Sequence, residues 1–196
     1  MRGRIGTSER RSACSAQTHT KARFTPESAA AIARNKDFLL GLEEALIPAF
    51  YNPLFGHPRT AEIFHEGERP DREETLRQWW HRTVDSPIDQ SYWEWMTLVG
   101  LVHVRRQVKN PMMLAMWNLI VSLVETEGEK KLPPAEVGAL TRAFTQLSST
   151  VGSLIAESYT ETYIGALADV AGLEPALSAR MVRMQVEELE SKARQG

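Results

Sequence analysis

The segment WMTLVGLVHVRRQV, residues 95–108, is an apolar run that contains one histidine, His103, shortly before two arginines. At helical spacing, His103 shares a face with Val99 and Met96, so its ring projects from an apolar stripe. Gly100 lies three residues earlier on what we take to be the same face, where the missing side chain would let a broad, flat molecule approach closely. The segment therefore predicts a helix that presents one imidazole to an apolar space.

Two interpretations of His103 follow from this pattern. A histidine in an apolar stripe is most often a packed side chain that hydrogen-bonds one backbone carbonyl. A five-coordinate haem, in contrast, needs only one protein imidazole beside a flat apolar slot. Unlike a zinc site, it needs no cluster of His and Cys ligands, so the second interpretation stays open.

Composition places the chain among ordinary globular proteins. Its 196 residues are 42% hydrophobic and 24% charged, with a net charge of −2, so we expect one domain and neither nucleic acid nor an anionic membrane as partner. One cysteine, Cys14, rules out a disulfide framework. No segment approaches the roughly 20 apolar residues of a membrane span, and we expect a cytoplasmic protein. The Arg- and Ser-rich start, residues 1–24, predicts a disordered basic tail, with a transit peptide as the alternative.

The rest of the chain has the periodicity of helices, without a strand pattern. Thr25 is a predicted N-cap with Pro26 at the first helical position, and we expect Pro48 to kink or break the helix that contains it. Arg105 and Arg106 are expected to mark the end of their helix that reaches solvent. The predicted helices, besides a short helical piece at 58–65, include 71–84, 88–108, one beginning near 111, 134–171 and a charged one after 175, with a loop at 127–134.

The longest predicted helix, 134–171, carries a heptad seam, which is the geometry of packing within a helical bundle or across a dimer. Its apolar residues step by three and four: Val137, Leu140, Phe144, Leu147, Val151 and Leu154. The sequence thus predicts an all-α fold of roughly seven or eight helices. It carries no GxGxxG, P-loop, HExxH or GxSxG motif for a nucleotide or a catalytic nucleophile.

The segment VGLVHVRRQV at 99–108, with the methionine-rich NPMMLAMW at 110–117 after it, resembles the proximal-histidine segment of globin-coupled sensors and protoglobins. The resemblance spans roughly residues 25–172, followed by a charged C-terminal helix or linker at 173–196. It implies a globin-like helical sandwich with an extra N-terminal helix, and a non-covalent haem b whose iron is held by His103. It departs from the family at Pro111, Met112 and Met113, where members often carry Lys-Trp-Tyr.

Two further segments carry the resemblance. AFYNPLFGHP at 49–58 is similar to the family's distal helix end, which implies that Tyr51 hydrogen-bonds the gas ligand; the alternative is a core tyrosine whose hydroxyl reaches the surface. REETLRQWW at 72–80 corresponds to the helix that covers the distal face. Because Trp79 and Trp80 are not both expected to face inward, we assign Trp79 to the pocket. The resemblance implies these site residues: His103, Tyr51, Phe55, Thr75, Leu76, Trp79, Met96, Val99, Met112, Met113 and Trp117.

The resemblance implies reversible binding of a diatomic gas, with oxygen first and carbon monoxide or nitric oxide as alternatives, in a sensor or a carrier. The rival functions are a haem-free signalling module and a haem enzyme. We expect no enzyme, because neither a fused reductase nor a distal His/Arg pair for O–O cleavage is evident. The seam suggests a homodimer through the last long helices. Because the chain ends about 24 residues after its long helix, without an output domain, a signalling partner in trans is the expected alternative.

Overall fold

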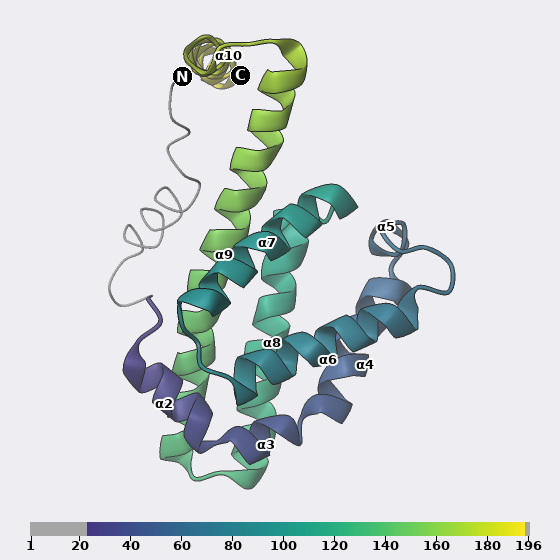
Figure 1. Cartoon of the computed structure of the whole chain (residues 1–196), viewed down its shortest axis with the longest axis vertical. Coiled ribbons are helices and arrows are strands. Elements are labelled where there is room, and N and C mark those ends of the chain that lie inside the picture. The colour runs from purple at the N-terminus through teal and green to yellow at the C-terminus, as the bar shows by residue number, and fades with distance from the viewer. Residues whose placement is uncertain (1–22, 195–196) are drawn as a thin grey trace.

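Three consecutive helices build the centre of the structure: α7 (Gln90–Arg106), α8 (Asn110–Lys131) and α9 (Pro134–Ala171). The computed structural model describes residues 23–194, and within this range the chain forms nine helices and no strand, which confirms the predicted all-α class. Only two residues join α8 to α9, so the two helices return along each other, while α7 crosses α9 (Figure 1).

The remaining helices surround this centre. Helices α2 (Pro26–Arg34) and α3 (Lys36–Leu40) lie at one end, with α2 packed against α9, and α4 (Glu43–Gly56) and α6 (Arg69–Asp85) cover one side (Figure 1). The short α5 (Pro58–Ala61) lies between α4 and α6, and α10 (Pro175–Ala193) follows α9.

Several helix boundaries follow the capping chemistry of the sequence. Thr25 is the N-cap of α2, where its side chain accepts a hydrogen bond from the Ser28 backbone N–H, and Pro26 takes the first helical position. The predicted bounds of the longest helix are confirmed, because α9 begins at Pro134 and ends before Gly172, whose φ of 63° is left-handed.

The predicted break at Pro48 is wrong, whereas the alternative of a kink there stays a prediction, and the predicted loop at 127–134 is also wrong. The helix α4 runs through Pro48 without interruption and instead begins after Gly41 and Leu42. Pro48 lies on the exposed face, as does Glu44, whose carbonyl loses its helical partner and stays accessible to water. The predicted loop at 127–134 is largely helical, since α8 continues to Lys131.

The heptad seam of α9 is buried within the chain. Its residues are all buried, from Val137 through Phe144 and Val151 to Leu154, and α9 packs with them against α7, α8 and α2. The seam therefore serves the bundle within one chain, so its residues are not available to a dimer interface.

The close crossing of α7 and α9 depends on Gly100. A Cβ atom at Gly100 would lie 2.8 Å from the Ser158 Cβ and 3.0 Å from the Ile155 carbonyl oxygen. The Ser158 hydroxyl donates to the Thr97 carbonyl at 3.0 Å across the same crossing. The expectation that Gly100 opens a slot for a flat ligand is therefore wrong: this glycine brings two helix backbones together.

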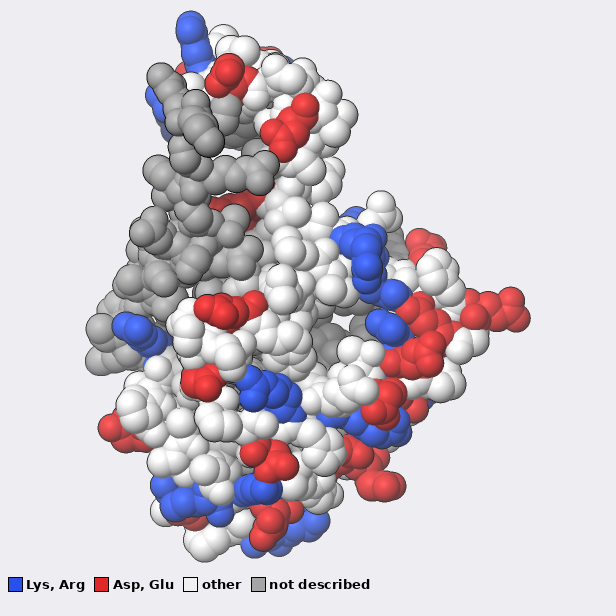
Figure 2. Space-filling model, viewed as in Figure 1, with Lys and Arg blue, Asp and Glu red and all other residues white. Residues whose placement is uncertain are grey.

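Beyond Ser158, α9 leaves the body of the molecule, and α10 lies across its far end (Figure 1). Acidic and basic side chains are intermingled on the face shown in Figure 2, in keeping with the net charge of −2. Among the described residues, no helix combines the length and the apolar character that a membrane span requires. The predicted tail falls outside the described residues as far as position 22, whereas Phe24 packs against Trp93 with ring centroids 5.7 Å apart.

Candidate functional site

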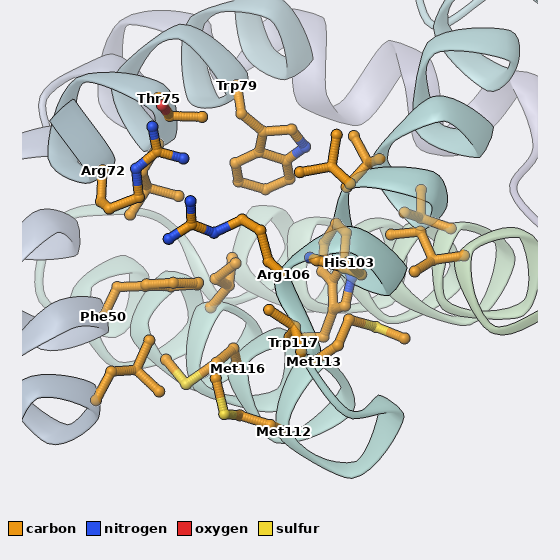
Figure 3. Close-up of a pocket in the computed structure, with 18 of the residues that line it drawn as sticks. Phe50, Arg72, Thr75, Trp79, His103, Arg106, Met112, Met113, Met116 and Trp117 are labelled. Carbon is orange, nitrogen blue, oxygen red and sulfur yellow. The ribbon is translucent and has the colours of Figure 1, made fainter. Parts of the chain in front are cut away.

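A pocket of about 350 Å³ lies between α4, α6, α7, α8 and α9. This volume is within the range of about 300–1,000 Å³ that small-molecule sites occupy. Its walls are mostly aliphatic, aromatic and thioether side chains, and a few polar groups enter from α4, α6 and α7 (Figure 3). These polar groups are Tyr51, Arg72, Thr75, His103 and Arg106.

The pocket brings together almost all of the residues that the sequence suggested. Ten of the eleven lie in its wall: Tyr51, Thr75, Leu76, Trp79, Met96, Val99, His103, Met112, Met113 and Trp117. Phe55 is the exception, and its assignment to the pocket is wrong. Its ring stacks on Phe64 with centroids 4.3 Å apart and lies under the Arg69 guanidinium at 5.4 Å, so Phe64 forms that part of the wall instead.

His103 sits in the last turn of α7 with its ring in the pocket wall (Figure 3). Burial lowers the pKa of the imidazole from 6.5 to about 4, and no other described group offsets this effect. The ring is therefore neutral at physiological pH. A packed histidine would hydrogen-bond one backbone carbonyl, but no such bond is made by the His103 ring among the described residues. An unprotonated imidazole nitrogen without a partner in an apolar wall is suited to metal ligation.

Tyr51 is 7% exposed and surrounded by the rings of Phe50, Phe55 and Phe64. Its hydroxyl donates to the Arg72 backbone carbonyl on α6 at 2.6 Å, so it does not reach the surface. Burial raises the pKa of Tyr51 to about 12, which keeps the hydroxyl protonated. Tyr51 is thus a hydrogen-bond donor in the pocket wall whose single proton is already shared with a carbonyl.

Both neighbouring tryptophans of α6 face the interior, contrary to the expectation that only one would. Trp79 lines the pocket, as predicted, and meets Trp117 edge-on at 5.3 Å. Trp80 is 1% exposed, donates its indole N–H to the Leu39 carbonyl at 3.0 Å, and stacks on Phe144. The helix is covered on two flanks, by the pocket and by the core, so adjacent side chains can both be buried.

Four methionines contribute to the pocket wall: Met96 from α7, and Met112, Met113 and Met116 from α8. Three of them are buried, and Met112 is partly buried. Thioether side chains adapt to irregular apolar shapes, so this wall adjusts to an aromatic ligand at low cost. Two of these methionines occupy the departure from the family pattern noted above.

The sequence interpretation missed two arginines in the pocket wall, Arg72 and Arg106 (Figure 3). The sequence predicts Arg106 at the solvent-facing end of its helix, but its side chain is only 19% exposed and pairs with Glu68 at 2.5 Å. Arg72, at the polar start of α6, gave no signal because its neighbours in the sequence are also charged. Whether a charged residue near the end of a helix faces the pocket or the solvent depends on the direction of its side chain, which the sequence alone does not give.

The other described histidines lie elsewhere. His57 and His65 are exposed, and His81 is paired with Glu43 at 2.7 Å on the surface. None of these three lines the pocket, and the described residues contain no cluster of three or more His, Cys, Asp or Glu side chains that would hold a metal ion. Among the residues that the structure describes, His103 is therefore the only histidine in the pocket wall.

One comparison with known proteins identifies a family for the chain. The model of the family described as Protoglobin matches residues 15–164, about three quarters of the chain. The match begins ten residues earlier than the resemblance that the sequence suggested, and it covers every residue of the pocket wall. No curated protein matches the chain.

Proposed function

The chain belongs to the protoglobin family of globin-fold haem proteins, and on that premise we propose that its pocket binds haem b non-covalently and a diatomic gas reversibly. The observation that carries the proposal is His103, a neutral imidazole that has no hydrogen-bond partner among the described residues and lies in the wall of an apolar pocket of about 350 Å³. Five-coordinate haem iron requires one such ligand.

The residues around His103 fit a tetrapyrrole. Trp79, Trp117 and Val99 supply flat or apolar surface, and the methionines of α8 supply surface that adapts to its shape. Haem iron would supply an open coordination position for the gas. His103 would hold the iron, the apolar walls would exclude water, and Tyr51 would donate its hydroxyl proton toward the gas after leaving the Arg72 carbonyl.

Oxygen is the first choice of gas, with carbon monoxide and nitric oxide as alternatives, because a hydroxyl donor favours the more polar ligand. Tyr51 remains protonated at physiological pH, so it can act only as a donor or a neutral acceptor.

The composition of the pocket favours gas binding over the two rival functions. A haem-free signalling module does not require an open apolar pocket, and in such a module we would expect close-packed side chains to fill this space. A haem enzyme that cleaves O–O bonds needs a distal base beside its arginine. Within the described part of the chain, the pocket wall contains arginines but no histidine apart from His103. Gas binding, in a sensor or a carrier, therefore uses the residues that the pocket contains.

We also propose that the chain forms a homodimer, or binds a signalling partner, through the end of α9 and α10. In place of the buried seam, this part of the chain carries a series of exposed large apolar side chains: Tyr163, Ile164, Leu167, Val170, Leu177, Met181, Val182, Met184, Val186 and Leu189. Apolar exposure on this scale is typical of interaction surfaces. Light scattering on the full chain and on Leu167→Glu tests the dimer, and a monomeric wild type would exclude it.

The decisive experiment is the absorption spectrum of the full chain after addition of haem. We expect a Soret band that shifts with carbon monoxide, and its loss in His103→Ala at stoichiometric haem. Added imidazole should restore the band in that variant. The control is His81→Ala, which removes an exposed histidine outside the pocket. A wild type without a band, or a His103→Ala protein with an unchanged spectrum, would contradict the proposal.

A further inference from the structure

Two guanidinium groups occupy one part of a pocket that is otherwise almost entirely apolar. Arg72 comes from α6 and Arg106 from α7, and the two side chains extend toward one another in the pocket (Figure 3). They are 26% and 19% exposed. A partly buried charge is costly unless it is paired, so two like charges placed together require a negatively charged partner.

One carboxylate serves both arginines. The same oxygen of Glu68, Oε1, lies 2.5 Å from Arg106 Nη2 and 3.1 Å from Arg72 Nε. The other oxygen accepts the His65 backbone N–H at 2.9 Å. The nearby Glu73 is occupied by Arg69 at 2.7 Å. Two positive charges thus share one negative charge, which leaves an excess of one positive charge beside the pocket.

One hydrogen-bond donor of this pair, on Arg72, has no acceptor among the described residues. Arg72 Nε is buried, and although it lies near Glu68, its N–H is not aligned with that oxygen and has no hydrogen-bond acceptor. Arg106 Nη2 reaches the Ile63 carbonyl only at 3.5 Å. A buried donor without an acceptor is rare in folded proteins, and it points to a ligand that supplies the acceptor. Guanidinium groups match carboxylates in shape and charge.

Resting on the proposed function, we propose that Arg72 and Arg106 bind the propionate carboxylates of the tetrapyrrole, and that Glu68 acts as their internal counter-ion until the ligand arrives. We call Arg72 and Arg106 together the anion clamp. Arg106 follows His103 by one turn of α7, so the iron ligand and one member of the clamp lie on the same helix, while Arg72 reaches the pocket from α6. The pocket then selects a dianionic porphyrin and fixes its orientation about the axis of the iron ligand.

The test compares haem b with its dimethyl ester, which has the same ring and iron but no carboxylate charge. Both are titrated into the haem-free full chain, and binding is followed by the Soret band and by quenching of the tryptophans in the pocket wall, among them Trp79 and Trp117. Because hydrogen bonds to charged groups are strong, wild type should bind haem b about 10- to 150-fold more tightly than the ester.

Variants test whether the anion clamp causes the preference for haem b over its dimethyl ester. In Arg106→Met the preference should fall below about threefold, through weaker binding of haem b with little change for the ester. The matched control is Arg105→Met, which removes the same charge from an exposed neighbour on the same helix and should keep the preference. Glu68→Gln removes the competing carboxylate, and it should strengthen binding of haem b relative to the ester.

The outcomes separate this inference from the proposed function. Equal affinity of wild type for haem b and its ester would overturn the clamp while leaving haem binding intact. No binding of either porphyrin would overturn the proposed function, and the clamp with it. The wild-type comparison needs no variant, so it decides the matter even if Arg106→Met does not fold. An equal loss of preference in Arg105→Met would show that only the general charge of the helix matters, and would also refute the clamp.

Discussion

Replacement of Tyr51 by phenylalanine removes one hydroxyl from the pocket and leaves the ring. A donor to a partly charged ligand is worth about 1.5–3 kcal/mol, which by itself would predict a change of about 10- to 150-fold in affinity. The hydroxyl has only one proton, however, and it is donated to the Arg72 carbonyl at 2.6 Å. Breaking that bond costs about 0.5–1.5 kcal/mol, so the net gain from the tyrosine is about 1 kcal/mol.

We therefore expect Tyr51→Phe to speed oxygen dissociation from the haem-loaded protein by about fivefold, and carbon monoxide dissociation by less. Stopped-flow displacement of each gas measures both rates. The matched control is Tyr92→Phe, which removes a buried hydroxyl that contacts Thr83 at 3.0 Å outside the pocket. It should leave both rates unchanged. Equal effects on the two gases would show that Tyr51 is not the donor, and an effect above about 50-fold would show that the Arg72 carbonyl does not compete.

Three further predictions concern the described contacts. Gly100→Ala should lower the free energy of unfolding by about 1–2 kcal/mol, because the added Cβ would overlap α9. Gly138→Ala, whose added Cβ meets no atom within 4 Å, should raise the free energy of unfolding by about 0.5–1 kcal/mol. Urea denaturation measures both variants, and equal effects would disprove the close crossing. Below pH 6.5 the unfolded chain binds a proton at His103 that the folded chain does not bind until about pH 4, so the haem-free protein should lose about 2 kcal/mol of stability between pH 7.5 and 5. His103→Leu should remove that loss, and an unchanged pH profile would refute this origin. Trp80→Phe should destabilise the haem-free protein by about 2 kcal/mol, because it loses packing and an indole hydrogen bond. Trp79→Phe should mainly reduce the quenching of fluorescence by haem, because Trp79 lines the pocket. Thermal denaturation and fluorescence titration measure the two effects, and a larger loss of stability in Trp79→Phe with a larger loss of quenching in Trp80→Phe would contradict the structure.

Helical periodicity was sufficient to predict the class of the fold, and the family resemblance supplied most of the residues that line the pocket. Periodicity predicted the bounds of α9, and it placed Val99 and Met96 beside His103, because residues three, four and seven apart share a face. It did not predict the course of α4, because a proline on an exposed helix face interrupts a hydrogen bond without ending the helix.

The errors on α7 have one geometric cause. At about 100° per residue, Gly100 and Arg106 lie about 60° from His103 in opposite directions around the helix. The structure turns the Gly100 side toward α9 and the Arg106 side, together with Val99 and Val102, toward the pocket. Periodicity within one helix gives these angles but does not show which neighbouring helix lies on each flank. That information comes only from the packing of distant segments.

The contact of Gly100 with Ser158 has a mechanical consequence. Ser158 is the last buried residue of α9, and the helix continues from there for about 20 Å to Ala171. The helix that bears His103 therefore contacts α9 at Ser158, the point (here called the pivot) from which the exposed end of α9 extends. A rotation of about 5° at this pivot would move the tip by about 2 Å, whereas side chains beside the pivot would move by only a fraction of that distance. A side chain at position 100 would hold the two backbones apart, so the seating of α7 against this point of α9 depends on glycine.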